Sequence, residues 1–130
     1  MIAAGFGFRG AATVESLRDA LERAAVGHRV TLLAAPADKA DAAALRSLAG
    51  ALGVPVIAVA AGDLAATDTP SRSARVLAAR GTGCVAEAAA LVAAGGGGPA
   101  RLLGPRVVSA DRLATCAIAV GAIAVTGASP

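Results

Sequence analysis

The stretch MIAAGFGFRG, residues 1–10, starts the chain with a short apolar run followed by spaced glycines. Residues 1–4 predict a short buried strand, and Gly5, Gly7 and Gly10 predict a tight turn after it. A helix should follow, with Thr13 as its N-cap and Glu15 in the positively polarised first turn. A strand, a glycine-containing turn and a helix in this order are typical of an α/β fold.

The same alternation continues through the first sixty residues. Segments 29–35 and 54–59 are apolar and predict two further strands. Between them, Asp41 should cap a second helix that ends at Gly53 and has Leu45, Leu48 and Leu52 on its apolar face. A strand-helix-strand-helix-strand pattern predicts a parallel sheet with helices on its faces.

The second half of the chain is less regular. Helices are expected at 61–66, 71–80 and 85–94, and a final strand at 115–120. Two short apolar pairs flank a turn at Gly104-Pro105. Because no linker or repeat divides the sequence, residues 1–130 are expected to form one α/β domain.

Composition narrows the class of ligand. The chain has two Phe and no Tyr or Trp, and its net charge of +3 comes from scattered Arg with a single lysine, Lys39. Nucleic-acid binding is not expected, because it needs basic clusters or aromatic stacking platforms. A modest positive bias instead favours a small polyanion. Cys84, Cys116 and His28 show no metal-ligand spacing, so neither a metal nor a cofactor is expected.

No membrane or export segment is expected either. The N-terminus lacks the basic start that precedes the apolar core of a signal peptide. The most apolar segment, 114–125, is roughly a dozen residues long, which is too short to span a bilayer. A cytoplasmic protein without a membrane partner is therefore expected.

The glycines of residues 5–10 match G-x-G-x-x-G, the pattern of dinucleotide-binding turns. That pattern also needs an acidic residue at the end of the second strand, where this chain has Ala35 and Pro36, and Asp38 comes only after the proline. A dinucleotide-binding module remains an alternative, but binding of another anion in this turn is favoured. Arg9 lies inside the turn and can clamp a carboxylate with two parallel hydrogen bonds.

A second glycine-containing turn, residues 81–84, precedes the helix expected at 85–94. Gly83 and Cys84 are candidate binding residues there, and Glu87 in the first helical turn is a candidate general base or acid. Glu15 is a second, weaker catalytic candidate, and Thr13 is a candidate ligand contact as well as a cap. Lys39 after the second strand and Arg106 beside the strand at 107–108 complete the set of candidate cations.

Five segments together resemble the CobE and CbiG C-terminal-domain family of cobalamin (vitamin B12) biosynthesis. They are residues 5–15, the Lys39-Ala40-Asp41 segment, the box from Gly81 to Leu91, Pro105-Arg106, and the strand from Thr115 to Ala119. They occur in the family's order and span essentially the whole chain. Two positions depart from the family pattern, since Cys84 stands where the family usually has Ser and Arg106 where it has Lys.

The resemblance implies a three-layer α/β/α fold around a mixed, mostly parallel sheet of about five strands. It also implies a corrin precursor as ligand, of the precorrin or hydrogenobyrinic acid type, whose carboxylates would meet Arg9, Lys39, Arg106 and the two glycine turns. Longer members resembling CbiG are hydrolases that open the lactone of cobalt-precorrin-5A and carry an additional N-terminal domain. Because the length here resembles stand-alone CobE, binding of the precursor is the first expectation, and a lactone-opening hydrolase is the alternative. Another enzyme of the cobalamin pathway is a candidate partner.

Overall fold

A computed structural model describes residues 2–67, 85–96, 99–104 and 106–121. Six strands are β1 (Ile2–Phe8), β2 (Leu32–Pro36), β3 (Val56–Val59), β4 (Ala100–Leu102), β5 (Val107–Val108) and β6 (Ala114–Gly121). The helices in these ranges are α1 (Val14–Ala24), α2 (Ala43–Leu52), α3 (Ala61–Ala65) and α5 (Val85–Gly95). None of these helices is long and apolar enough to cross a membrane.

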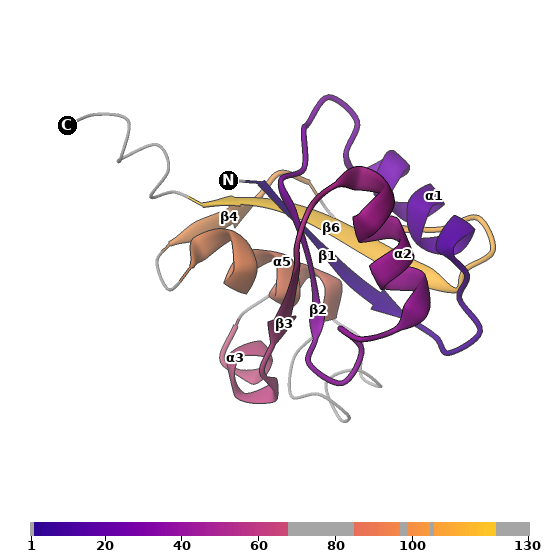
Figure 1. The fold of residues 1–130 in the computed structure, drawn as a ribbon. Helices are drawn as coiled ribbons and strands as arrows, with labels where there is room; N and C mark the ends of the chain where they lie inside the picture. Colours follow the sequence, from indigo (N-terminus) through magenta and orange to yellow (C-terminus); the bar gives the residue numbers. More distant parts are fainter. Residues whose placement is uncertain (1, 68–84, 97–98, 105, 122–130) are drawn as a thin grey trace.

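The strands form one mixed sheet in the order β3-β2-β1-β6-β4, and β5 also pairs with β6 (Figure 1). Strands β1, β2 and β3 pair in parallel, as the alternation of strands and helices predicts. β6 lies antiparallel to β1 and pairs antiparallel with β4 and β5 on its other side. The expected α/β class with a mixed sheet is confirmed. Within the described ranges, parallel pairing is limited to β1, β2 and β3, and the sheet has six strands where about five were expected.

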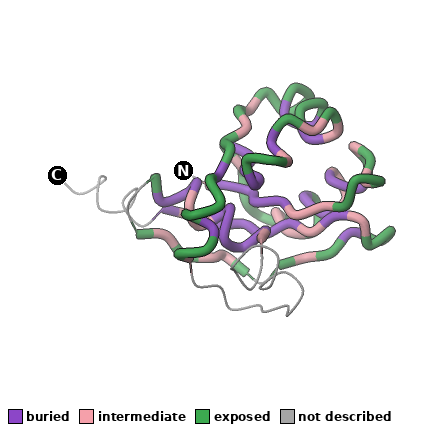
Figure 2. Tube along the Cα trace, turned by 90° about the horizontal axis from the view of Figure 1, so that it is seen from below, coloured by how far each residue is buried: buried purple, intermediate pink, exposed green. Residues whose placement is uncertain are grey.

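Helices cover both faces of the sheet and make it the middle of three layers. On one face, α1 and α2 pack against side chains such as Ala4, Phe6 and Ile118. On the other face, α3 and α5 pack against Ala3, Ala34 and Ala119. Successive side chains of a strand point to opposite faces, so the alternation in β1 supplies both cores. Figure 2 shows a buried centre with exposed residues on the outer helical turns and loops. Most residues of β1, β2 and β6 are buried, whereas β3, β4 and β5 are largely exposed or partly buried.

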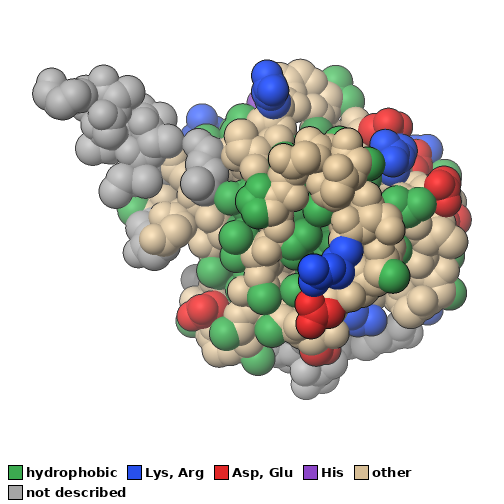
Figure 3. Space-filling view, in the orientation of Figure 1, with side chains coloured by type: hydrophobic (Ala, Val, Ile, Leu, Met, Phe, Trp, Pro, Cys, Tyr) green, Lys and Arg blue, Asp and Glu red, His purple; other side chains and the backbone are tan. Residues whose placement is uncertain are grey.

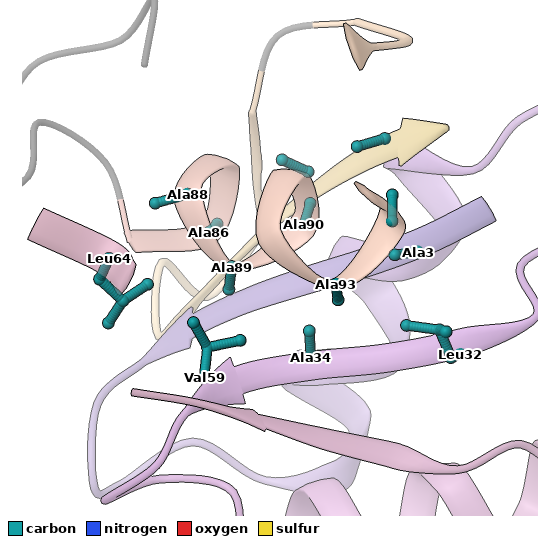
Figure 4. Close-up of a cluster of buried hydrophobic side chains, with 13 residues drawn as sticks. Ala3, Leu32, Ala34, Val59, Leu64, Ala86, Ala88, Ala89, Ala90 and Ala93 are labelled. Atoms are coloured by element: carbon teal, nitrogen blue, oxygen red, sulfur yellow. The ribbon is translucent and has the colours of Figure 1, made fainter. Parts of the chain in front are cut away.

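The layer under α5 is built from very small side chains. The buried residues of this helix are alanines, Glu87 and Gly95. Figure 4 shows Ala93 pointing toward Ala34 of the sheet and Ala89 toward Val59. At Gly5, an added Cβ would lie 2.1 Å from the carbonyl oxygen of Ala86. An added Cβ at Gly121 would lie 2.3 Å from the carbonyl oxygen of Ala94. Gly5 and Gly121 therefore let the backbones of helix and sheet approach closely.

Several expectations about helix ends hold. Thr13 caps α1 in a capping box with Ser16. Gly53 ends α2 with a left-handed φ of 70°, a conformation that glycine adopts without strain. The expected short helix after β3 is confirmed as α3.

Other local expectations are wrong. Asp41 does not cap α2. The N-cap is Ala42, and Asp41 forms an ion pair with Arg46 at 3.0 Å instead. Leu52 is 42% exposed, because it falls on the last residue of the helix, and Ala49 packs in the core instead. The first strand runs to Phe8 and not only to residue 4. The helix expected at 71–80 lies outside the described residues.

Candidate functional site

One edge of the sheet gathers most of the predicted binding residues that the structure describes. The parallel strands β1, β2 and β3 end there at Phe8, Pro36 and Val59. Because β6 is antiparallel to β1 and Ala114 lies opposite Phe8, the loop before β6 reaches the same edge. We call the loops at this edge, residues 9–13, 37–42 and 109–113, the carboxyl rim. Ligands of open α/β sheets commonly bind beyond this end of the parallel strands.

Arg9 and Lys39 converge on the carboxyl rim. The Nζ of Lys39 lies 5.3 Å from the ring centroid of Phe8, the residue that precedes Arg9, at the distance of a cation–π contact. The amide of Arg9 donates a 2.9 Å hydrogen bond to the carbonyl of Leu113 in the loop before β6. Arg9 is exposed and Lys39 half-buried. The Lys39 side chain is thus held beside the residue that precedes Arg9, and the Arg9 backbone is fixed to the loop before β6.

The glycine motif is not a phosphate-binding turn, which corrects the sequence interpretation. Gly5 and Gly7 lie within β1, where they pair with Ala117 and Thr115 of β6. Only Gly10 lies in the turn, and an added Cβ there would meet no atom within 4 Å. A dinucleotide fingerprint needs its first glycines in the turn between strand and helix. The alternative of a dinucleotide-binding module assumed that Gly5 and Gly7 lie in this turn, and that assumption is wrong.

The second predicted turn is described only from Val85 onward, and Gly83 and Cys84 lie outside the described residues. Val85 is close to β1, since an added Cβ on Gly7 would lie 3.6 Å from the Val85 Cβ. The first turn of α5 therefore begins beside the end of β1.

Glu87 and Arg106, predicted as catalytic and binding residues, are brought together. Glu87 has no exposed surface, and its Oε2 accepts a 3.3 Å hydrogen bond from the amide of Arg106. Arg106 itself is exposed. The hydrogen bond between Glu87 and Arg106 lies on the face of the sheet that α5 covers. The Lys39–Phe8 contact lies on the other face, where Phe8 packs with α1 and α2. The described candidate residues thus fall into two groups, one on each face of the sheet.

The remaining predicted residues have local roles. The Thr13 hydroxyl accepts a hydrogen bond from the amide of Ser16 at 3.2 Å. It also lies 3.2 Å from the Ser16 hydroxyl, so it is engaged in capping. Glu15 is exposed in the first turn of α1, where a carboxylate interacts favourably with the helix dipole.

Sequence reasoning missed a polar network that holds the loop before β6. The carboxylate of Asp111 accepts hydrogen bonds from the hydroxyls of Ser16 and Ser109, both at 2.5 Å, and from the amide of Leu113 at 3.0 Å. Asp19 accepts a 2.7 Å hydrogen bond from the amide of Ala110. The Ser-x-Asp spacing within a turn between strands is a local signal for such bonding. The link to Ser16, 95 residues away, has no local signal.

These bonds lower the pKa of two carboxyl groups. The Ser109 and Ser16 hydroxyls and the Leu113 amide hold the pKa of Asp111 below its usual value of 3.8. The Ala110 amide, followed by Arg23, lowers the pKa of Asp19 in the same way. A hydrogen bond to the ionised form favours that form.

A pH-dependent stability follows for Asp111. Because the pKa of Asp111 is lower in the folded protein, its ionised carboxylate stabilises the fold above about pH 3.8. This stabilisation is lost as the pH falls through the folded-state pKa. We expect Asp111→Asn to be less stable than the wild type near neutral pH and the difference to shrink below this pH. Urea unfolding at several pH values measures the difference.

Asp63→Asn is the matched control, since Asp63 is an exposed carboxylate of α3 whose side chain makes no hydrogen bond to the described residues. Its difference from the wild type should stay small at every pH. A pH-independent difference for Asp111→Asn would contradict the role of the ionised carboxylate.

A second surface feature lies away from the carboxyl rim. An open hollow between the ends of α1 and α2 is lined by Leu21, Glu22, Ala25, His28, Arg29, Val30 and Leu52. Val30 precedes the start of β2, so this hollow lies at the opposite edge of the sheet. Figure 3 shows the basic side chains of the face drawn there dispersed, several of them beside acidic ones. The described residues contain no group of three or more His, Cys, Asp or Glu side chains that can hold a metal ion.

Comparison with known proteins gives one family. The family described as Cobalamin synthesis G C-terminus matches residues 2–119. A crystal structure of CobE, a protein from the cobalamin (vitamin B12) biosynthetic pathway, is 37% identical over 92% of this chain and 89% of its own, with a TM-score of 0.82. The cobalamin biosynthesis protein chiG from Agrobacterium tumefaciens is 36% identical over 94% of this chain and 99% of its own, with a TM-score of 0.70. Among curated proteins, none matches the chain.

Proposed function

Given that this chain belongs to the cobalamin synthesis G C-terminus family, we propose that it binds a carboxylate-rich corrin precursor at the carboxyl rim. The observation that supports this best is that two separate loops of the rim carry Arg9 and Lys39, with Lys39 packed against Phe8, the residue before Arg9. The corrin intermediates of the cobalamin pathway carry several acetate and propionate groups. Cations that are spaced apart on a protein surface can bind such carboxylates.

The two cations suit different parts of this task. The guanidinium of Arg9 can form two parallel hydrogen bonds with one carboxylate. The ammonium of Lys39 is a compact charge, and its contact with the Phe8 ring holds it at the rim before a ligand arrives. A preordered cation loses less conformational freedom on binding, so it contributes more to affinity.

A lactone-opening hydrolase is the alternative activity. It would need Glu87 or Glu15 to activate a water molecule beside the substrate. The complete burial of Glu87 and its hydrogen bond to the Arg106 amide favour a positioning role for this carboxylate. Binding is therefore the activity that the site supports best, with Glu87 anchoring the segment that carries Arg106.

Titration with hydrogenobyrinic acid, followed by the visible absorbance of the corrin ring, tests the proposal. The wild type should give a saturable change, and Arg9→Gln and Lys39→Gln should each weaken binding by about tenfold, the effect of losing one charge-assisted contact. Raising the ionic strength should weaken wild-type binding, because salt screens exposed charges.

Arg29→Gln is the matched control. It removes one exposed positive charge at the hollow on the opposite edge of the sheet, so it should bind as the wild type does. Equal weakening in all three variants would indicate a general charge effect and no site at the rim. An absence of any saturable change in the wild type would contradict the proposed function.

A further inference from the structure

Arg112 lies in the loop that β6 brings to the carboxyl rim. Ala114 pairs with Phe8, so the residues just before Ala114 emerge beside those just after Phe8. The 2.9 Å hydrogen bond from the Arg9 amide to the Leu113 carbonyl joins the two loops. Arg112 is therefore one residue from the bonded partner of Arg9, and both arginines are exposed.

The loop that carries Arg112 is held on several sides. The Arg112 amide donates to the Ser109 carbonyl at 2.9 Å, and the Ser109 amide donates to the Ala114 carbonyl at 2.9 Å. The Asp111 carboxylate accepts from two hydroxyls and an amide, and Asp19 holds the Ala110 amide. Ser16 and Ser109 are almost completely buried, so this scaffold belongs to the packed protein.

Arg112 has an unusual backbone conformation. Its φ is 63°, and among the residues that the structure describes it is the only one other than glycine with a positive φ. Glycine adopts this region without strain, whereas a side chain there is disfavoured and persists when its surroundings hold it in place. An arginine thus occupies a position where the backbone favours glycine.

Arg112 does not form an ion pair with its neighbour Asp111. The Asp111 carboxylate is bonded to neutral donors, and within the described residues Arg112 makes no ion pair. We propose that Arg112 is a further binding residue for the ligand and forms with Arg9 a clamp for one carboxylate of the macrocycle. The proposal rests on the proposed function and adds to it a residue outside the predicted set. In this arrangement the network of Ser16, Ser109 and Asp111 positions Arg112.

The test is Arg112→Gly in the full chain, titrated with hydrogenobyrinic acid. Glycine accepts the positive φ, so thermal unfolding should show a variant at least as stable as the wild type. Its affinity for the ligand should nevertheless fall by about tenfold, the effect of losing one charge-assisted contact. Arg112→Lys keeps the charge and should weaken binding less than Arg112→Gly, because only the paired hydrogen bonds of the guanidinium are lost.

The outcomes separate this inference from the function on which it rests. Arg112→Gly binding as tightly as the wild type, while Arg9→Gln binds more weakly, would overturn the role of Arg112 and leave the proposed function standing. Failure of the wild type to bind would instead contradict the proposed function. Arg29→Gln, with the same loss of charge at the opposite edge, should match the wild type, and weakening there equal to that of Arg112→Gly would also overturn the inference.

Discussion

Replacing Gly5 with alanine is expected to destabilise the protein by about 3 kcal/mol or more, at the upper end of the cost of overpacking a core. The new Cβ would lie 2.1 Å from the Ala86 carbonyl oxygen and 2.4 Å from the Ala90 amide nitrogen. Both are backbone atoms of α5 and cannot rotate away as a side chain can. The helix must therefore move off the sheet, which separates the alanines that pack against β1.

Gly7→Ala is the matched control for this prediction. Gly7 lies two residues further along β1, on the same face of the strand, but its added Cβ would be 3.6 Å from the nearest atom, an ordinary contact. We expect a change within about 1 kcal/mol, because no atom needs to move. Urea unfolding of both variants measures the difference, and similar stabilities would contradict the close approach of α5 to β1.

Replacing Glu87 with alanine is expected to destabilise the protein by about 2 kcal/mol and to weaken corrin binding. The substitution leaves a cavity at a fully buried position and removes the acceptor for the Arg106 amide. The segment that carries Arg106 then loses its anchor at α5. Urea unfolding and the corrin titration measure the two effects.

Glu87→Gln separates a positioning role from a catalytic one. The amide of glutamine has nearly the same shape and retains an oxygen that accepts a hydrogen bond, so stability and corrin binding should stay close to those of the wild type. A glutamine cannot serve as a general base. If the wild type opens a lactone substrate and Glu87→Gln does not, while both bind it equally, the positioning role is wrong and the hydrolase alternative stands.

Much of the fold could be predicted from local patterns. The alternation of apolar segments and helix-type spacing predicts β1, α1, β2, α2 and β3 in their observed order, and the ends of the helices at Thr13 and Gly53 follow from capping preferences. The order of the strands in the sheet could not be predicted in the same way, because β6 follows the other described strands in the chain but pairs with β1. Pairing of that kind depends on contacts between distant segments.

For the candidate site, residue types were more predictable than roles. Arg9 could be selected because it lies among spaced glycines, and Lys39 because it is the single lysine of the chain. Glu87 could be selected because it is the acid in the first turn of an otherwise apolar helix. The structural role of Gly5 could not be predicted from the sequence, because a glycine can serve either a tight turn or a close approach of two backbones. Only the position of α5 over β1 distinguishes these two explanations.

The sequence alone determined the α/β class, the helix ends at Thr13 and Gly53 and the family resemblance, because these depend on residue spacing along the chain. The tertiary structure decided three further points: that Gly5 and Gly7 lie in a strand, that Glu87 bonds to the Arg106 amide, and that Asp111 bonds to Ser16. Each depends on two segments that are distant in the sequence and meet in the fold. Local spacing cannot encode such a meeting, because it arises from the packing of all layers together.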